Sequence, residues 1–370
     1  MIQFSLFDDE GAMQESTDWK WSFKDYPKEK NGLKVFSCFA CGGGSTMGYK
    51  LAGCDVLGCV EIDPKMNEIY VKNHHPKYNY CMDLREFNQI PDNELPGELF
   101  HLDILDGSPP CTTFSMAGDR EDSWGKKKKF REGQKEQTLD DLSFVFIDTV
   151  RKLKPKVVIM ENVEGLLLGE AWVYVQKIYK NLSEIGYKTK HWLLKGEEMG
   201  IPQQRHRVFF LAVQTDNKVN LNKINMMFNY LPVPYQTIKS GDGEKLAEKT
   251  LDCKMLSKAI RSDKSIADVY ERLGEKPRRF SAAICWDDKV LPTILAKIFH
   301  YRPIEKSRIS TEDVIHAQTF PEDYDFVTDK SREKEYVCGM SVPPVMMKRF
   351  VTRLIEQGVF NYKKEEQNNV

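Results

Sequence analysis

The chain has 370 residues, of which 41% are hydrophobic and 29% charged, proportions typical of a globular protein with one or two buried cores. It contains no long uncharged apolar run, and its first residues lack the basic-then-apolar pattern of a secretory signal. Nine scattered cysteines favour reduced thiols over a disulfide framework. We therefore expect a cytoplasmic protein rather than a membrane or secreted one.

The net charge of −1 hides an uneven distribution. Residues 215–310 hold 18 lysines and arginines against 12 acids, and a second basic run comprises Lys126, Lys127, Lys128 and Lys129. Runs of charge are most often solvated surface. They also suit a polyanionic partner, so the charge pattern alone leaves the partner open.

A regular alternation of strands, turns and helices follows an irregular N-terminal stretch of 32 residues. Short apolar runs predict strands, and amphipathic runs predict helices. Apolar strands separated by helices are typical of a doubly wound α/β domain, whose parallel sheet is covered on both faces. The predicted strands are 34–38, 54–60, one through 104–105 and 157–160, and the predicted helices are 45–51, 64–73 and 139–153.

The pattern changes near residue 213. Residues 215–290 mix basic, aromatic and asparagine-rich stretches without a sustained period, which predicts a second, irregular domain. Regularity returns at 291–296, and a last helix is expected over 344–356. We expect a larger domain formed by residues 1–214 plus 330–370 and a smaller one formed by 215–329.

A glycine-rich turn, Phe39-Ala40-Cys41-Gly42-Gly43-Gly44, joins the first strand to its helix. Ligands of doubly wound sheets bind beyond the carboxyl ends of the strands, and glycine lets the backbone approach them. Glu61 ends the second strand, where a carboxylate can bind both hydroxyls of a ribose. Asp83 ends the third, where it can accept from an adenine amino group. Since no phosphate-binding motif accompanies them, S-adenosylmethionine fits better than NAD.

Two reactive groups follow the ends of later strands. Cys111 comes directly after Pro109-Pro110, and Glu161-Asn162-Val163 ends the next strand. A thiolate can add to an electron-poor heterocycle while a nearby acid keeps a ring nitrogen protonated. Cys38 and Cys41 form a C-x-x-C pair, as in zinc and redox sites. Because no histidine pair completes such a site, we interpret them as buried structural thiols and expect no metal.

Together these segments resemble the DNA cytosine-C5 methyltransferase family, in the same order over most of 34–214 and 291–357. The matching motifs are the cofactor loop at 39–44, GSPPCTTFS at 107–115, ENV at 161–163, QQRHR at 203–207, Arg308 with QTFP at 318–321, and GMSVPP at 339–344.

The resemblance implies a class I S-adenosylmethionine-dependent methyltransferase domain, Rossmann-like, that methylates C5 of a cytosine flipped out of duplex DNA. It implies that the Cys111 thiolate adds to C6 and that Glu161 keeps N3 protonated. Asn162 would orient Glu161 or the nucleophile loop, Arg205 would contact the cytosine O2, and Arg207 would support the loop or a phosphate. The donor would leave as S-adenosylhomocysteine.

The resemblance also implies two sets of binding residues. The long polar stretch 114–138 is expected to close over the flipped base and grip the phosphate backbone. The expected cofactor contacts are Phe39, Ala40, Cys41, Gly43, Gly44, Glu61, Ile62, Asp83, Leu84, Pro110, Leu142, Ser341 and Val342. The expected DNA contacts are Ser115, Lys126, Lys127, Lys128, Gln203, Arg278, Arg279, Thr293 and Arg308, with Lys276 as a further candidate.

Three positions depart from the family pattern. Cys41 stands where a glycine is usual, Thr112 where glutamine is common, and Met340 where an asparagine usually helps to hold the cofactor. We expect looser cofactor binding but not loss of activity. Two alternatives stay open: an RNA cytosine methyltransferase on the same scaffold, and an inactive DNA-binding relative. We expect a monomer that acts on duplex DNA, with a cognate restriction endonuclease as a further candidate partner.

Overall fold

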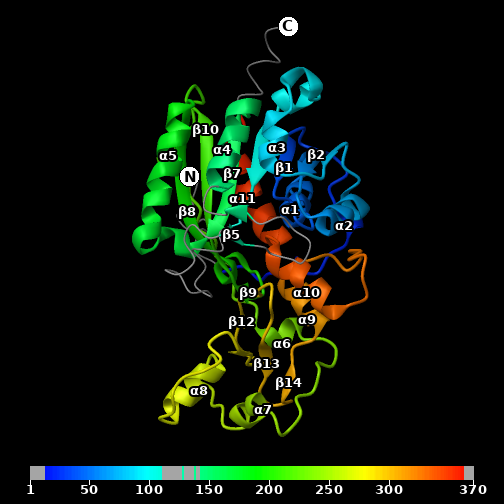
Figure 1. Ribbon diagram of the computed structural model, residues 1–370, viewed down its shortest axis with the longest axis vertical. Coiled ribbons are helices and arrows are strands. Elements are labelled where there is room, and N and C mark those ends of the chain that lie inside the picture. The colour runs from blue at the N-terminus through cyan, green and yellow to red at the C-terminus, as the bar shows by residue number, and fades with distance from the viewer. Residues whose placement is uncertain (1–12, 111–126, 129–136, 139–141, 362–370) are drawn as a thin grey trace, which may run out of the picture.

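A computed structural model describes residues 13–110, 127–128, 137–138 and 142–361. A larger lobe is built around one sheet, and a smaller lobe, residues 239–309, projects from it at the bottom of Figure 1. Within the described ranges, no helix is long and apolar enough to cross a membrane.

The larger lobe contains a seven-stranded sheet with the order β3-β2-β1-β4-β7-β10-β8. The strands from β3 to β7 run parallel, whereas β10 is antiparallel to both of its neighbours. The predicted doubly wound α/β domain is thus confirmed. The seven strands are β1 Lys34–Cys38, β2 Asp55–Val60, β3 Tyr78–Tyr80, β4 Ile104–Gly107, β7 Val157–Val163, β8 Tyr187–Lys195 and β10 His206–Gln214.

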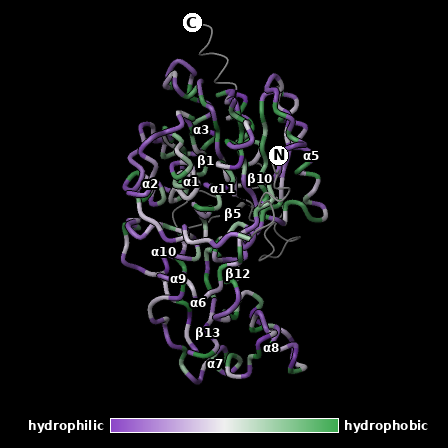
Figure 2. Tube along the Cα trace, turned by 180° about the vertical axis from the view of Figure 1, so that it is seen from behind, coloured by the Kyte–Doolittle hydropathy of each residue, from purple (hydrophilic) through white to green (hydrophobic). Residues whose placement is uncertain are grey.

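Alternate residues along the central strands enter two cores on opposite faces of the sheet. Val157 and Phe209 belong to one core, and their neighbours Val158 and Phe210 belong to the other. This follows from the two-residue repeat of a strand. Figure 2 shows hydrophobic residues gathered inside this lobe. Helices α1 Gly44–Leu51, α2 Pro64–His74 and α11 Pro344–Glu356 cover the first face, and α3 Leu84–Gln89, α4 Leu142–Leu153 and α5 Trp172–Glu184 cover the second.

Two of these helices begin directly after the strands that precede them because an aspartate caps each one. Asp63 accepts hydrogen bonds from the amides of Lys65 and Met66 at the start of α2. Asp83 accepts from the amide of Arg85 at the start of α3. Such caps satisfy amides that have no partner inside the helix. They also fix the turns that leave the carboxyl edge of the sheet.

The smaller lobe has a small core of its own. Its eight buried residues lie between Met255 and Tyr301, and only short elements surround them. The irregular domain expected from the sequence therefore corresponds to a chain of short elements joined by loops. These elements are α7 Leu251–Leu256, α8 Ile266–Arg272 and the three-stranded sheet of β11 Ala283–Ile284, β13 His300–Arg302 and β14 Ser307–Arg308.

The segments that flank the smaller lobe pack in the first core of the larger lobe, through residues such as Leu221, Ile224 and Phe320. Arg302 forms a buried ion pair with Asp313 at this junction. The domain limits at 215 and 329 therefore stay a prediction.

The remaining helices and strands are α6 Tyr235–Ile238, α9 Thr311–Ala317, α10 Ser331–Met340, β9 Gln203–Gln204, which pairs with β12 Leu291–Pro292, and the pair β5 Lys127–Lys128 and β6 Gln137–Thr138. Short 3-10 turns are η1 Phe23–Asp25, η2 Asp92–Glu94, η3 Gly97–Phe100, η5 Glu164–Leu167, η6 Gly169–Ala171, η7 Gly196–Met199 and η8 Leu221–Lys223.

Candidate active site

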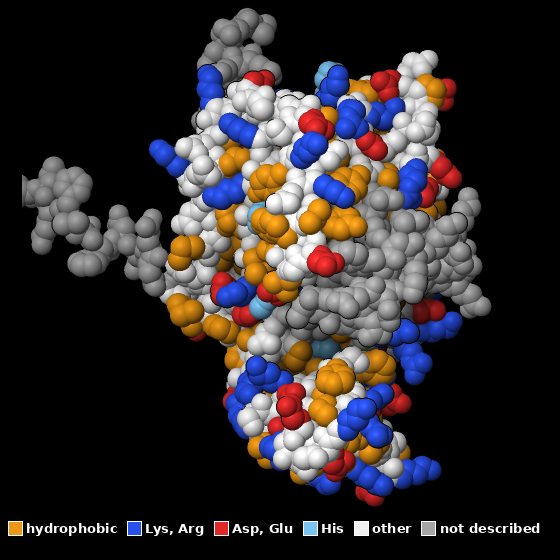
Figure 3. All heavy atoms as spheres, turned by 60° about the vertical axis from the view of Figure 1, so that its left-hand side comes forward, with side chains coloured by type: hydrophobic (Ala, Val, Ile, Leu, Met, Phe, Trp, Pro, Cys, Tyr) orange, Lys and Arg blue, Asp and Glu red, His pale blue; other side chains and the backbone are white. Residues whose placement is uncertain are grey.

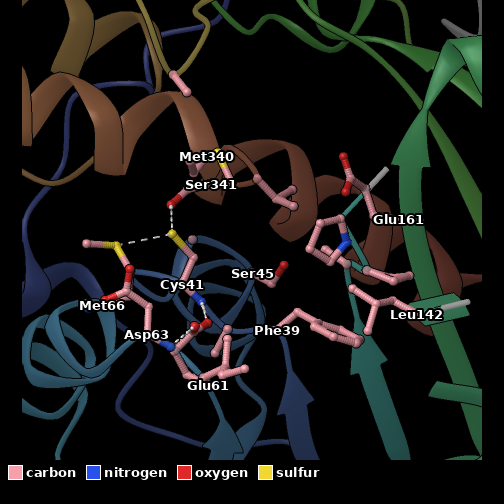
Figure 4. A pocket seen from close by; sticks show the side chains of 18 of the residues that line it. Phe39, Cys41, Ser45, Glu61, Asp63, Met66, Leu142, Glu161, Met340 and Ser341 are labelled. Carbon is pink, nitrogen blue, oxygen red and sulfur yellow. Dashed lines mark hydrogen bonds between the residues drawn. The ribbon is translucent and has the colours of Figure 1, made fainter. Parts of the chain in front are cut away.

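A cavity of about 290 Å³ opens at the carboxyl ends of β1, β2, β4 and β7 (Figure 4). Open α/β sheets bind their ligands at this edge. Most of the residues expected at the site line this one cavity. They are Phe39, Ala40, Cys41, Gly44, Glu61, Ile62, Asp83, Leu84, Pro110, Leu142, Glu161, Asn162, Arg205, Arg207, Ser341 and Val342.

The loop between β1 and α1 forms one wall through an unusual backbone path. Phe39 and Cys41 both adopt left-handed conformations, with φ of 57° and 48°. A Cβ atom on Gly44 would lie 2.2 Å from the carbonyl oxygen of Val342, so only glycine allows α1 to begin there. Gly43 faces the other way: a Cβ atom there would lie 2.0 Å from Nε2 of His74. Gly43 is not among the residues that line the cavity, and its expected cofactor contact stays a prediction.

Glu61 is buried at the end of β2, and both of its carboxylate oxygens hold backbone amides. Oε2 accepts from the amide of Cys41 at 2.7 Å and Oε1 from that of Asp63 at 2.8 Å. Burial raises the pKa of Glu61 to about 7, although these hydrogen bonds oppose the shift. Each oxygen can accept a second hydrogen bond. The side chain can therefore still receive the hydroxyl groups of a ribose.

Sulfur atoms form the rim beside Glu61. Sγ of Cys41 lies 3.7 Å from Sδ of Met66 and 3.8 Å from Oγ of Ser341 (Figure 4). Burial raises the pKa of Cys41 to about 12, so the thiol stays protonated at neutral pH. Met340 lines the same cavity. With cysteine at position 41 and methionine at position 340, this wall of the cavity is less polar than the residues usual in the family would make it.

Glu161 and Arg207 form an ion pair at the opposite end of the cavity. Glu161 ends β7, and Nε of Arg207 on the adjacent β10 lies 2.9 Å from its Oε1. The contact is ionic rather than a well-aligned hydrogen bond, since Oε1 has no hydrogen-bond partner. Asn162 donates from Nδ2 to the carbonyl of Pro109 at 3.4 Å. This bond ties the end of β7 to the loop that leads to Cys111, which itself lies outside the described residues.

Arg205 does not occupy the place expected from the sequence. Its guanidinium group is buried and donates to the carbonyl oxygens of Ile294 at 3.1 Å and Ser341 at 2.9 Å. It also donates to the carbonyl of Gly339 at 3.4 Å. These bonds fasten the smaller lobe and the end of α10 to the segment between β9 and β10. The arginine beside Glu161 is Arg207, so the roles expected for the two arginines need correction.

Several expected DNA contacts are occupied within the protein. Gln203 is fully buried: Nε2 donates to Oε1 of Gln318, and Oε1 accepts from the amide of Ile294. Thr293 donates to the carbonyl of Gln204. Arg308 donates to the carbonyl of Ile298 at 2.8 Å and pairs with two glutamates. The side chains of Gln203, Thr293 and Arg308 are therefore interdomain fasteners here, which corrects their expected role.

The remaining expected DNA contacts divide into three groups. Arg278 and Arg279 are both exposed, and Arg279 pairs with Asp252. Lys127 and Lys128 lie in β5, and their side chains are outside the described residues. Ser115 and Lys126 are outside them altogether.

Buried polar atoms without partners test whether the cavity suits a polar ligand. Oγ of Ser108, Oε1 of Glu161 and Nε of Arg205 are all buried without a hydrogen-bond partner in the described protein, and all three residues line the cavity. Unsatisfied buried polar groups are costly, so a ligand that binds them is favoured. In the described part of the chain, no group of three histidine, cysteine, aspartate or glutamate side chains could hold a metal ion.

Sequence reasoning missed several residues that line the cavity. Ser45 and Met66 lie on the helices that follow the two strand-end turns. Tyr336 precedes Met340 by four residues on α10, a helical spacing that could have revealed it. Leu295 and Ala296, which follow β12, gave no signal because their exposure depends on how the lobes meet.

Asp106 was missed as well, although a carboxylate inside an apolar strand is itself a signal. It is buried at the end of β4, where Oδ2 accepts from Ser37 at 2.6 Å and Oδ1 from Tyr49 at 3.0 Å. Burial raises the pKa of Asp106 to about 7, against the effect of these hydrogen bonds. It joins β1, α1 and β4 directly behind the cavity.

Comparison with known proteins identifies relatives along the whole chain. Type II methyltransferase M.HindV of Haemophilus influenzae is 27% identical over 90% of this chain and 98% of its own length. M1.HphI of Haemophilus parahaemolyticus is 23% identical over 85% of this chain and 84% of its own length. M.FnuDI of Fusobacterium nucleatum is 29% identical, but the chain spans only about half of it, 51%.

Solved structures share the fold. A protein described as a DNA modification methyltransferase, encoded within a prophage of Escherichia coli, matches 88% of this chain and 99% of its own with a TM-score of 0.63 at 18% identity. DNMT2 of Spodoptera frugiperda matches 88% of this chain and 100% of its own with a TM-score of 0.61 at 16% identity. The family model of the C-5 cytosine-specific DNA methylases matches residues 33–356. The chain belongs to this family, and it is a DNA cytosine methyltransferase that takes its methyl group from S-adenosylmethionine.

Proposed function

We propose that Glu161 and Arg207 bind the edge of a flipped cytosine and that Cys111 is the nucleophile of the reaction. One observation carries this proposal. The Glu161–Arg207 pair and the residues suited to an adenosyl group line the same cavity. A base at this pair and a donor at Glu61 can therefore meet without any movement of the sheet.

The cofactor half of the cavity fits S-adenosylmethionine. Glu61 would take the ribose hydroxyls and Asp83 the adenine amino group, while Phe39 and Ile62 offer apolar contact for the adenine. Ser341 and Val342 close the opposite side. When bound, S-adenosylmethionine supplies an electrophilic methyl group. The chain's own task is to hold that group, keep water away and activate the base.

Activation of the base needs a nucleophile and a proton at fixed places. The Cys111 thiolate would form a bond to C6, C5 would gain the methyl group and then lose its proton to a base, and the bond from sulfur to C6 would break. Glu161 would hold a proton at N3 throughout, which offsets the charge that develops on addition. Arg207, held beside Glu161, would donate to O2.

The position of Arg205 supports a different role from the one expected of it. Its guanidinium group reaches three backbone carbonyls on two segments that flank the cavity. We assign it to positioning, with Arg207 as the arginine that contacts the base. Burial lowers the pKa of both groups, and the Glu161 carboxylate opposes this for each of them.

The smaller lobe is proposed as the target-recognition domain, with duplex DNA between the two lobes. Its own core, from Met255 to Tyr301, covers a shorter stretch than the predicted 215–329. We further propose that the enzyme acts as a monomer in the cytoplasm of a bacterium or of a phage-infected host. A cognate restriction endonuclease is a candidate companion, since several relatives are Type II methyltransferases.

The nucleophile is tested by transfer of a tritiated methyl group to unmodified plasmid DNA and, separately, to transfer RNA. We expect label in the DNA with the parent protein and none with Cys111→Ser. Cys81→Ser is the matched control because Cys81 is an exposed thiol that does not itself line the cavity. DNA that contains 5-fluorocytosine should form a covalent adduct with the parent only. Equal labelling by Cys111→Ser contradicts the covalent route, and label confined to RNA contradicts the substrate.

A further inference from the structure

The loop between α8 and β11 presents an aromatic side chain to solvent. Phe280 is 76% exposed, an exposure shared among the large hydrophobic side chains only by Ile304 within the described residues. A single exposed apolar residue needs no explanation in general. Phe280 is set apart by its neighbours, since Lys276 and Arg278 on the same loop are exposed cations.

Contacts of Arg279 fasten the loop that carries Phe280 to the rest of the smaller lobe. Arg279 adopts a left-handed conformation with φ of 63°, which side chains rarely adopt without compensating contacts. Its guanidinium group pairs with both oxygens of Asp252, and one of these bonds, from Nε, is 3.0 Å long. It also donates to the hydroxyl of Tyr301 and lies 5.3 Å from the ring of Phe299. The Arg279 side chain stays about 40% exposed, and these contacts tie the loop to Asp252 and Tyr301.

A short stretch of chain connects the base of this loop with the active-site cavity. Leu295 and Ala296 line that cavity. Phe299 follows Ala296 by three residues, a span of roughly 10 Å at most. Its carbonyl accepts from the amide of Ala283 at 2.8 Å, directly after the loop. The chain therefore leads from the cavity to the base of this loop in a few residues.

We propose that Phe280 is a DNA-contacting residue whose ring packs against the bases of the bound duplex, while Arg278 and Lys276 hold the flanking phosphates. The inference rests on the proposed function and extends it to a specific contact. An aromatic ring beside cations is complementary to DNA, because the apolar ring can pack against base edges in a groove while the cations bind the backbone. Figure 3 shows lysine and arginine side chains beside hydrophobic ones over the smaller lobe.

Ile304 provides a matched control. It is equally exposed at 76%, and it lies in the turn between β13 and β14. Its neighbours Glu305 and Lys306 carry opposite charges, and Glu305 also pairs with Lys239, so this turn lacks the purely basic flank of Phe280. Neither Phe280→Ala nor Ile304→Ala removes a core contact, and both variants should unfold at the temperature of the parent.

The test begins with the full-length parent and unmodified plasmid DNA, whose methylated sites are mapped by bisulfite sequencing. A short duplex with the mapped site then serves for steady-state kinetics and binding. We expect Phe280→Ala to raise Kd and KM for this duplex about 5- to 100-fold, as loss of a good contact to base edges does. We expect Ile304→Ala to leave both unchanged and Phe280→Trp to restore most of the affinity. Cofactor affinity should be the same in all variants.

Salt dependence separates the ring from its cations. Arg278→Ala should reduce the slope of log Kd against log salt by about 0.9, and Phe280→Ala should leave the slope unchanged. Phe280→Ala with the Kd and KM of the parent would overturn this inference while leaving the proposed function intact. A parent protein that methylates no duplex DNA would instead overturn the proposed function.

Discussion

The two lobes position their functional residues by different means. In the larger lobe, Glu61 and Glu161 end strands of a continuous sheet, and backbone pairing fixes where they point. In the smaller lobe, three short strands and two short helices surround a small core, and ion pairs such as Arg279–Asp252 fix the loops. A sheet tolerates few changes at its carboxyl edge, whereas loops held by side-chain pairs can change with little cost to the fold. Backbone pairing in the sheet thus positions the residues of the candidate active site, whereas side-chain contacts position the loops of the smaller lobe.

The largest effect is expected from a substitution that blocks methyl transfer and leaves the smaller lobe unchanged. Glu161→Gln removes the acid at the base-binding end but keeps the size of the side chain. We expect kcat to fall about 10²- to 10⁴-fold, which is typical for loss of a general acid, with DNA and cofactor affinities within about threefold of the parent. Single-turnover methylation and separate binding measurements check this. A kcat near that of the parent would remove Glu161 from the reaction.

The second prediction concerns an ion pair at the junction of the two lobes and tests whether they can be perturbed independently. Asp313 is fully buried and pairs with Arg302 across the junction, and it accepts from the amides of Ser240 and Ser310. Asp313→Asn leaves the buried Arg302 cation without a counter-charge, so we expect the free energy of unfolding to fall by about 3–5 kcal/mol. We expect weaker DNA binding but nearly unchanged cofactor affinity, measured by urea unfolding and by calorimetry.

An exposed ion pair in the same lobe gives the control for this change. Arg261 and Asp288 pair with side chains about half exposed, so Asp288→Asn should cost less than about 1 kcal/mol. If Asp313→Asn abolishes cofactor binding in proportion to its loss of stability, the two lobes form one cooperative unit. The contrast drawn between them then fails.

The smallest effect concerns pH and the larger lobe. The raised pKa of Asp106, about 7, means that the folded protein keeps a proton that the unfolded chain has lost above the ordinary value near 3.8. The unfolded state therefore binds fewer protons between these values, and stability should fall as pH rises from about 4 to 7. Asp106→Asn should flatten this slope in unfolding curves at pH 5, 6 and 7. A slope as steep as that of the parent assigns the dependence to other groups, of which Glu61 is the first candidate.

The sequence predicted the sheet and most of the cavity because both depend on local patterns. Apolar runs marked the strands, and the acids Glu61 and Glu161 stood directly after them. Parallel strands bring their carboxyl ends to one edge, so residues distant in sequence could be assigned to one site.

The two arginines show where that reasoning ends. Arg205 lies between β9 and β10, where the alternation of a regular strand does not apply. Which arginine faces Glu161 depends on the register of β10 against β7, which the sequence does not state. Gln203, Thr293 and Arg308 were assigned to DNA because they are polar and lie near motifs. Each has a partner in the other lobe, Ile294 for Gln203, Gln204 for Thr293 and Glu335 for Arg308, and these partners could not be read locally.

The carbonyl oxygen of Ser341 has a consequence for how specificity can be inherited. It accepts from both Arg205 and Gln318, so three distant stretches of chain converge on one atom. A foreign segment that replaced 239–290 would leave these bonds intact. One that ended inside 291–318 would have to bring its own partners for Gln203 and Arg205. Exchange of recognition segments between relatives should therefore succeed when both breakpoints lie outside 291–318. Chimeras with a breakpoint inside 291–318 should lose these hydrogen bonds and bind the methyl donor poorly.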